Sequence, residues 1–202
     1  MRLIFTRHGE SEANVQQIIS NRDLPHHLTE KGCSQAQALA EMLAERHVLT
    51  IYTSTILRAQ ETAEIVAGRL SLPVYPAAAL REFDCGIMEG RSYAEAWTAH
   101  QAVEAAWDAG DHDRRIEAGE SYNDLKNRFV PFVREFNEQY AATDGDIVLI
   151  SHGSMLHQML PLVLSNIDRN FVRQHPLGNC SCVRAVLQQS LLVCEKWAEI
   201  PL

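Results

Sequence analysis

The chain has 202 residues, of which 46% are hydrophobic and 22% charged, and its formal net charge at pH 7 is −8. This balance is typical of one globular domain with a substantial core, which we expect over residues 1–202. The acidic balance argues against a nucleic-acid surface, and no apolar run approaches the roughly 18 residues that span a bilayer. The start of the chain lacks the basic and apolar stretches of a signal peptide, so we expect a cytoplasmic protein.

The cysteines suggest neither a disulfide framework nor a zinc site, because their number is odd and no pair has Cys-x-x-Cys spacing. They are Cys33, Cys85, Cys180, Cys182 and Cys194. We interpret them as small buried hydrophobic residues. The rest of the sequence contains no metal site with enough correctly spaced ligands, so we predict neither a metal nor a cofactor.

The first apolar run, Leu3–Phe5, predicts a short buried strand that is followed by Arg7, His8 and Gly9. Ligands of open α/β sheets bind at the carboxyl ends of the strands, so a cation and an imidazole lie where chemistry is expected. Gly9 would let the chain turn sharply after His8. Residues 11–19 predict a short helix whose N-terminus faces this turn and could bind an anion.

The remaining elements alternate between helical and extended patterns. Apolar residues at helical spacing predict helices over residues 29–46, 54–70, 92–109 and 121–140, with another helix after residue 153. Short apolar runs predict strands over residues 49–53, 73–75, 146–150, 182–187 and 191–197. This alternation predicts a three-layer α/β domain, with helices on both faces of a mostly parallel sheet.

Several residues with chemical potential follow these strands. Arg58 lies in the first turn of a predicted helix, above the same sheet edge as His8. His152 follows the predicted strand 146–150, which delivers it to that edge. Three carboxylates, Glu82, Asp84 and Glu89, lie within eight residues of one another, and each is a candidate acid.

Five stretches of the chain resemble, in family order, the motifs of the histidine phosphatase superfamily, the phosphoglycerate-mutase-like enzymes. The stretches cover residues 6–14 (TRHGESEAN), 28–32 (LTEKG), 54–63 (STILRAQETA), 81–90 (REFDCGIMEG) and 151–153 (SHG). The chain departs from the family pattern at His27, where a proline usually stands. The resemblance implies a three-layer αβα sandwich of the phosphoglycerate mutase type.

The resemblance also assigns roles to residues, and among the three carboxylates it favours Glu82 as the acid. It implies a catalytic set of Arg7, His8, Arg58, Glu82 and His152, with Asn14 and Gly153 binding substrate. Arg7 and Arg58 should lower the pKa of His8 and keep a ring nitrogen available for attack. The proposed reaction has two steps, in which His8 takes the phosphoryl group and water then removes it, with Glu82 as general acid and base.

The pocket walls are expected in residues 20–27 and in a cap segment, residues 83–120, that includes a mobile flap. Arg22, His26 and His27 on the first segment could touch substrate or be solvated. Arg114 and Arg115 on the flap could bind a second anionic group or pair with the flap's own aspartates. Trp97 and Trp107 are interpreted as core or lid packing in preference to substrate stacking, and His157 as a packed or surface residue.

Three functions compete. The favoured one is a metal-independent phosphatase that acts on a small phosphomonoester. The expected flap indicates a partly covered pocket, which suits a small ligand better than a phosphoprotein. The second is a 2,3-bisphosphoglycerate-dependent phosphoglycerate mutase, and the third is a phosphate-ester sensor or scaffold without turnover. The sequence does not identify the phosphomonoester, and a homodimer is compatible with it.

Overall fold

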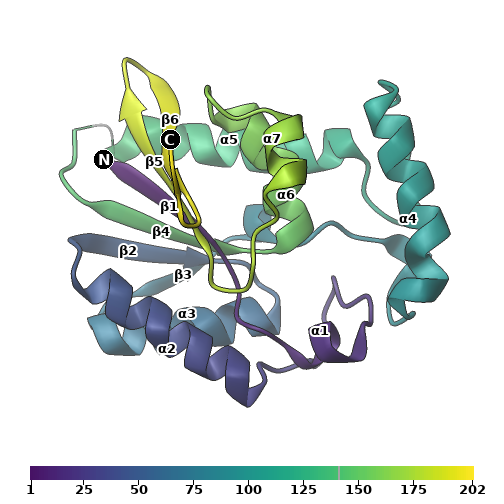
Figure 1. Ribbon diagram of the computed structural model, residues 1–202, viewed down its shortest axis with the longest axis horizontal. Helices are drawn as coiled ribbons and strands as arrows, with labels where there is room; N and C mark the ends of the chain where they lie inside the picture. Colours follow the sequence, from purple (N-terminus) through teal and green to yellow (C-terminus); the bar gives the residue numbers. More distant parts are fainter. Residues whose placement is uncertain (141) are drawn as a thin grey trace.

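The computed structural model describes residues 1–140 and 142–202, which form a seven-stranded mixed sheet with helices on both faces (Figure 1). The strand order is β3-β2-β4-β1-β5-β6-β7. The strands are β1 (Arg2–Arg7), β2 (Val48–Thr53), β3 (Val74–Pro76), β4 (Asp146–Ser151), β5 (Cys182–Gln188), β6 (Leu191–Trp197) and β7 (Ile200–Pro201). Strands β1 to β4 are parallel, and β5, β6 and β7 extend the sheet by antiparallel pairing. The predicted mostly parallel α/β fold is confirmed.

Alternate side chains of the central strands bury two separate cores, because successive residues of a strand face opposite sides of the sheet. Ile4 of β1 and Val148 of β4 face one core. This core is covered by α2 (Glu30–Ala44) and α3 (Leu57–Leu70). Leu3, Phe5 and Ile147 face the other core, under α5 (Tyr122–Tyr140), α6 (Gly153–Val163) and α7 (Arg169–Gln174). Figure 1 shows these two helical layers on opposite sides of the sheet.

One short helix, one long helix and two turns of 3-10 helix lie outside this sandwich or connect its elements. Helix α1 (Glu12–Gln16) follows β1, and α4 (Tyr93–Asp108) stands apart from the sheet, on the same side of the molecule as α1 (Figure 1). The 3-10 turns η1 (Ala78–Leu80) and η2 (Gly86–Met88) lead into α4. A capping box between Ser92 and Glu95 starts α4, and the Thr29 side chain caps α2. The predicted helices 29–46 and 92–109 agree with α2 and α4 within two residues.

The register of β1 on β4 brings two functional segments to the same edge of the sheet. Arg7 pairs with Ser151 at the carboxyl ends of these parallel strands. The next residues, His8 and His152, therefore leave the sheet side by side, and their ring centroids are 5.0 Å apart.

Gly9 and Gly32 are required by a close approach between the turn after β1 and the first turn of α2. A Cβ on Gly9 would lie 2.6 Å from the carbonyl oxygen of Gly32, and one on Gly32 would lie 1.9 Å from that of Glu10. Gly9 does not have a positive φ. The glycine therefore serves close packing of two backbones, whereas the sequence had suggested a sharp turn.

The predicted flap is tied to the rest of the cap segment by backbone hydrogen bonds. Ile87 N–H donates to the carbonyl of Glu117, and Glu120 N–H donates to that of Asp84. The buried Trp107 donates its indole N–H to the carbonyl of Arg114 at 2.7 Å. The mobility expected for this segment stays a prediction. Within residues 1–140 and 142–202, none of the helices has the length and apolar character needed to cross a membrane.

Candidate active site

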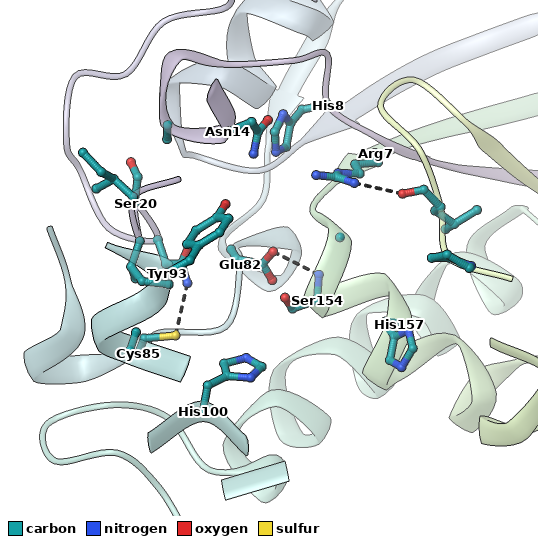
Figure 2. A pocket seen from close by; sticks show the side chains of 18 of the residues that line it. Arg7, His8, Asn14, Ser20, Glu82, Cys85, Tyr93, His100, Ser154 and His157 are labelled. Carbon is teal, nitrogen blue, oxygen red and sulfur yellow. Dashed lines mark hydrogen bonds between the residues drawn. The ribbon is translucent and has the colours of Figure 1, made fainter. Parts of the chain in front are cut away.

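A cavity of about 470 Å³ opens at the carboxyl edge of the sheet, between α1, α4 and α6. His8 and Asn14 lie at one end, and His100 and His157 lie at the other (Figure 2). Glu82 and Ser154 lie between the two ends. Of the seven residues to which the resemblance assigned roles, six line this cavity: Arg7, His8, Asn14, Arg58, Glu82 and Gly153.

The imidazole of His8 is buried, and both of its nitrogens are hydrogen-bonded. Nδ1 lies 2.6 Å from the carbonyl oxygen of Gly9, which can only accept, so Nδ1 carries a proton. Nε2 accepts the Nε hydrogen of Arg58 at 2.9 Å. The network thus assigns the neutral tautomer whose lone pair is on Nε2.

The environment of His8 keeps this ring neutral. Burial lowers the pKa of His8 well below its usual 6.5, and the positive charge of Arg58 lowers it further. The hydrogen bond to the Gly9 carbonyl opposes this effect, and Arg7 adds a smaller lowering. The sequence predicted the direction from the two arginines, but burial is the larger cause.

The Arg58 side chain is held by a backbone carbonyl, and its own carbonyl is linked through Thr62 to the turn after β1. Its side chain is buried, and Nη1 donates to the carbonyl of Ser20 at 2.6 Å. Its own carbonyl accepts the Thr62 hydroxyl at 2.7 Å, and Thr62 Oγ1 in turn accepts the N–H of Gly9 at 3.1 Å. Helix α3 and the turn after β1 are therefore fixed relative to one another, with the guanidinium against His8.

Arg7 reaches the cavity from the end of β1. Its Nη1 donates to the carbonyl of Leu177 at 2.9 Å, whereas its buried Nε has no partner among the described residues. Gly153 leaves room for this guanidinium, because a Cβ on Gly153 would lie 3.4 Å from Arg7 Cζ and Nε. The arginine thus keeps an N–H available for a ligand.

His152 is the N-cap residue of α6 and is completely buried. Its Nε2 is 2.7 Å from the hydroxyl oxygen of Ser54, and its buried Nδ1 has no partner among the described residues. Burial lowers the pKa of His152 well below 6.5, with further lowering by Arg58 and His8. A neutral imidazole with one unpaired nitrogen therefore lies beside His8.

Glu82 takes up the first free N–H groups of α6. Its Oε1 accepts from the backbone of Met155 at 2.7 Å and of Phe83 at 2.9 Å, and its Oε2 accepts from that of Ser154 at 3.0 Å. The N-terminus of a helix favours an anion, so it orients this carboxyl group in the cavity wall (Figure 2). Oε2 accepts one N–H, and its second lone pair can bind a proton.

The other two candidate acids have structural partners instead. Asp84 binds Arg22 at 2.9 Å and accepts the N–H of Gly86. Glu89 accepts the backbone N–H groups of Asn21 and Arg22. Neither lines the cavity, which leaves Glu82 as the one of the three that does.

Asn14 presents its amide to the cavity from α1. Its Oδ1 accepts the backbone N–H of Ser11 at 3.1 Å and the Ser11 hydroxyl at 3.2 Å. The Nδ2 hydrogens are consequently available to an oxygen in the cavity. This agrees with the position expected from the resemblance.

The loop residues expected to touch substrate lie outside the cavity lining. Arg22 is paired with Asp84 and also donates to the Ala118 carbonyl. His27 and Arg115 are paired with the carboxylates of Glu61 at 2.6 Å and Asp124 at 3.0 Å. Arg114 is exposed, and His26 contacts the Ser20 hydroxyl at 2.9 Å.

Sequence reasoning missed the wall opposite His8. It consists of Tyr93, Ala96, Trp97, His100 and Glu104 on α4, with His157 on α6. The α4 residues share one face of a helix, since they recur at three- and four-residue spacing, but this spacing alone does not show that the face lines a cavity. Trp97 lines the cavity and is 60% exposed, whereas Trp107 is core, as expected.

The comparisons with known proteins agree with this geometry. The sequence model of the histidine phosphatase superfamily (branch 1) matches residues 3–200. The chain belongs to this superfamily. The resemblance found in the five motifs is therefore confirmed.

Relatives of this histidine phosphatase include two kinds of protein. It is 31% identical to a glucosyl-3-phosphoglycerate phosphatase of Mycolicibacterium vanbaalenii, over 91% of this chain and 83% of the relative. It is 33% identical to a probable phosphoglycerate mutase GpmB of Proteus mirabilis, over 98% of this chain and 90% of the relative.

Solved structures show the same fold. The structure of a mycobacterial glucosyl-3-phosphoglycerate phosphatase complexed with VO3 matches with a TM-score of 0.82 and 29% identity, over 98% of each chain. Named phosphatases are thus among both the sequence relatives and the structural neighbours of this histidine phosphatase, as expected for a phosphoric monoester hydrolase.

Proposed function

We propose that this protein is a metal-independent phosphatase that hydrolyses a small phosphomonoester through a phosphohistidine on His8. The observation that carries the proposal is the neutral His8 ring, whose Nε2 lone pair is aimed at Arg58 Nε in a cavity shared with Glu82. A histidine nucleophile needs that lone pair, and a phosphate dianion needs the cation beside it.

In this proposal, the phosphoryl oxygens are bound by donors that have no other partner among the described residues. Arg7 Nε, Asn14 Nδ2 and His152 Nδ1 are three such groups. Ser54 Oγ accepts the N–H of Ile56, and its own proton is best placed on His152 Nε2, which puts the ring hydrogen of His152 on Nδ1. With the guanidinium of Arg58, these donors surround the charge that phosphoryl transfer spreads over the equatorial oxygens.

In the first step, the Nε2–P bond forms and the bond between phosphorus and the leaving oxygen breaks. Arg58 Nε transfers its hydrogen bond from His8 to a phosphoryl oxygen, and Glu82 gives its proton to the leaving oxygen. The phosphorylated imidazole is cationic, and the Gly9 carbonyl that accepts from Nδ1 stabilises it.

In the second step, the Glu82 carboxylate takes a proton from water, whose oxygen attacks phosphorus. The N–P bond breaks, inorganic phosphate leaves, and His8 returns to its neutral form. Both steps use the same carboxyl group, in opposite directions, as general acid and then general base.

The substrate is a small phosphorylated compound, since a cavity of about 470 Å³ suits a small ligand. The roles of the seven residues, the single domain over residues 1–202 and a cytoplasmic location are parts of this proposal. The resemblance supports the roles, and the composition supports the domain and the location.

Phosphate release from a panel of small phosphomonoesters, measured in EDTA, tests the proposal. The wild type should release phosphate, and His8→Ala should lose at least about 10³-fold in kcat/KM. Acid quenching at pre-steady state would destroy the intermediate, so an alkaline quench is used to trap phosphoprotein, which His8→Ala should not form. Release that needs a metal, or that survives in His8→Ala, would contradict the mechanism.

A mutase remains the second candidate, because a relative with 33% identity over 98% of the chain is named a probable phosphoglycerate mutase. The same preparation is therefore given 3-phosphoglycerate with catalytic 2,3-bisphosphoglycerate. Interconversion of the phosphoglycerates without net phosphate release would replace the phosphatase proposal by the mutase.

A further inference from the structure

The end of the cavity away from His8 forms an outer chamber lined by Trp97, His100, Glu104 and His157. Figure 2 shows His100 and His157 across the cavity from His8 and Asn14, with Glu82 between. When the phosphoryl group is on His8, this chamber receives the leaving group. The chemistry of its walls therefore decides which phosphomonoesters fit.

No arginine or lysine among residues 1–140 and 142–202 lines the outer chamber. Among the described residues that line the whole cavity, Arg7 and Arg58 are the only arginines or lysines. Arg58 donates to His8, and Arg7 lies beside His8 in Figure 2. Burial lowers the pKa of His157, so it adds no charge near pH 7. His100 Nδ1 lies 3.6 Å from Glu104 Oε2, so its ring faces that carboxylate.

The arginines around the chamber are held by carboxylates outside it. Arg169 and Arg173 both pair with Asp108. Arg22 pairs with Asp84 at 2.9 Å. None of the three lines the cavity, and each would have to abandon an ion pair to reach an anionic leaving group.

Glu104 is fixed in the chamber wall by a buried amide. Gln158, which is 4% exposed, donates its Nε2 hydrogen to Glu104 Oε1 at 2.9 Å. The orientation of that amide is set by Arg169, whose Nη2 donates to Gln158 Oε1 at 2.8 Å. If the Gln158 amide turned its oxygen towards Glu104, its hydrogen bond from Arg169 would be lost. The Nε2 group of Gln158 therefore stays directed at Glu104 and holds the carboxylate in place.

We propose, on the basis of the phosphatase function above, that the outer chamber selects phosphomonoesters whose leaving group is neutral or positively charged. A second anionic group, either carboxylate or phosphate, would meet Glu104 without a cation to balance it. Hydroxyl or ammonium groups of the leaving group instead donate to Glu104, while Trp97 covers its apolar or cationic part. Glu104 is the specificity-determining residue in this arrangement.

Two matched pairs of substrates test the proposal. Phosphoethanolamine and phosphoserine share an ammonium group and differ by a carboxylate. Glycerol 3-phosphate and 3-phosphoglycerate differ by a hydroxymethyl group in place of a carboxylate. The wild type should favour the member without the carboxylate in both pairs, by about 10- to 100-fold in kcat/KM, as expected for like charges several ångströms apart in a partly buried site.

Glu104→Gln keeps the shape of the side chain and removes its charge. It should reduce both ratios by about tenfold, chiefly by lowering KM for the carboxylate-bearing member. Glu64→Gln is the matched control, because it removes an exposed carboxylate of α3 that does not line the cavity, and it should leave both ratios unchanged.

The outcomes separate the two proposals. A wild type that prefers the carboxylate-bearing members, or ratios that are the same in Glu104→Gln, would overturn the selectivity while leaving the phosphatase function intact. 4-Nitrophenyl phosphate serves as the general substrate for this purpose. If neither it nor any member of the pairs releases phosphate in a His8-dependent way, the phosphatase function fails, and the selectivity that rests on it fails too.

Discussion

The Nε hydrogen of Arg58 points at the lone pair of His8 Nε2 across 2.9 Å, so the proposed nucleophile is bonded to the cation that binds its target. A phosphoryl group can approach Nε2 only by taking over this hydrogen bond. The arrival of an anion and the release of the lone pair are therefore one event. The predictions below follow from this pair and from the groups that surround it.

Replacing Arg58 should affect both the rate and its pH dependence. Arg58→Gln removes a positive charge that lowers the pKa of His8, so this pKa should rise towards its usual 6.5. The acid limb of kcat/KM should move to higher pH, and the plateau should fall by about 10²–10³-fold as transition-state stabilisation is lost. Arg69→Gln, on the exposed end of α3, is the control. A lower plateau with an unmoved acid limb would contradict the electrostatic role.

Replacing Glu82 should depend on the leaving group. For alkyl phosphates, Glu82→Gln should lower kcat/KM by about 10²–10⁴-fold, because the alkoxide leaves without its proton. For 4-nitrophenyl phosphate the loss should be below about tenfold, since a nitrophenolate needs little protonation and kcat/KM reports the first chemical step. Equal losses for both kinds of substrate would show that Glu82 only positions the first turn of α6.

The two buried histidines should make stability depend on pH. Their pKa values are well below 6.5 in the folded chain and ordinary in the unfolded chain, so below pH 6.5 the unfolded state binds more protons. The free energy of unfolding should therefore fall with decreasing pH, by up to about 1.4 kcal/mol per pH unit for each histidine. Urea denaturation between pH 5 and 7.5 measures this slope.

Variants assign that slope to the two residues. His8→Gln and His152→Gln should each flatten it, whereas the exposed His47→Gln should leave it unchanged. A wild-type stability that is constant below pH 6.5 would show that these rings take up protons in the folded state.

The contact between Gly9 and Gly32 should be sensitive to a single methyl group. Gly32→Ala would place Cβ 1.9 Å from the carbonyl oxygen of Glu10, which is backbone and cannot rotate away. We expect a loss of at least about 3 kcal/mol in the free energy of unfolding. Gly68→Ala in α3 meets nothing within 4 Å and should instead stabilise the protein by about 0.5–1 kcal/mol. Comparable effects of the two substitutions would be inconsistent with this packing.

The sheet and its reactive edge could be predicted from sequence because they depend on local rules. Apolar runs define the strands, and parallel strands end at one edge, which brings His8 and His152 together. Arg58 needed the family motif, since nothing local distinguishes it from a surface arginine. Glu82 needed the motif as well, because three carboxylates stood close together in the chain.

Local rules could not predict which residues form the wall opposite His8, or which carboxylates pair with the loop arginines. Helix α4 does not pack on the sheet in the manner of α2 or α5, so its apolar pattern does not say which face lines a cavity (Figure 1). The partners of Arg22 and Arg115 are carboxylates chosen by tertiary contacts. The lowering of the His8 pKa by burial depends likewise on how the whole chain closes around the ring.

Helix α4 begins with its own capping box and stands beside the sheet, yet it supplies most of the outer chamber wall. Under the proposed function, reaction chemistry and substrate choice thus reside in different segments of the chain. During evolution, substitutions over residues 93–104 can redirect the enzyme to a new metabolite while the motifs around His8, Arg58, Glu82 and His152 stay the same. Identical motifs in two members of the family therefore carry little information about whether they share a substrate.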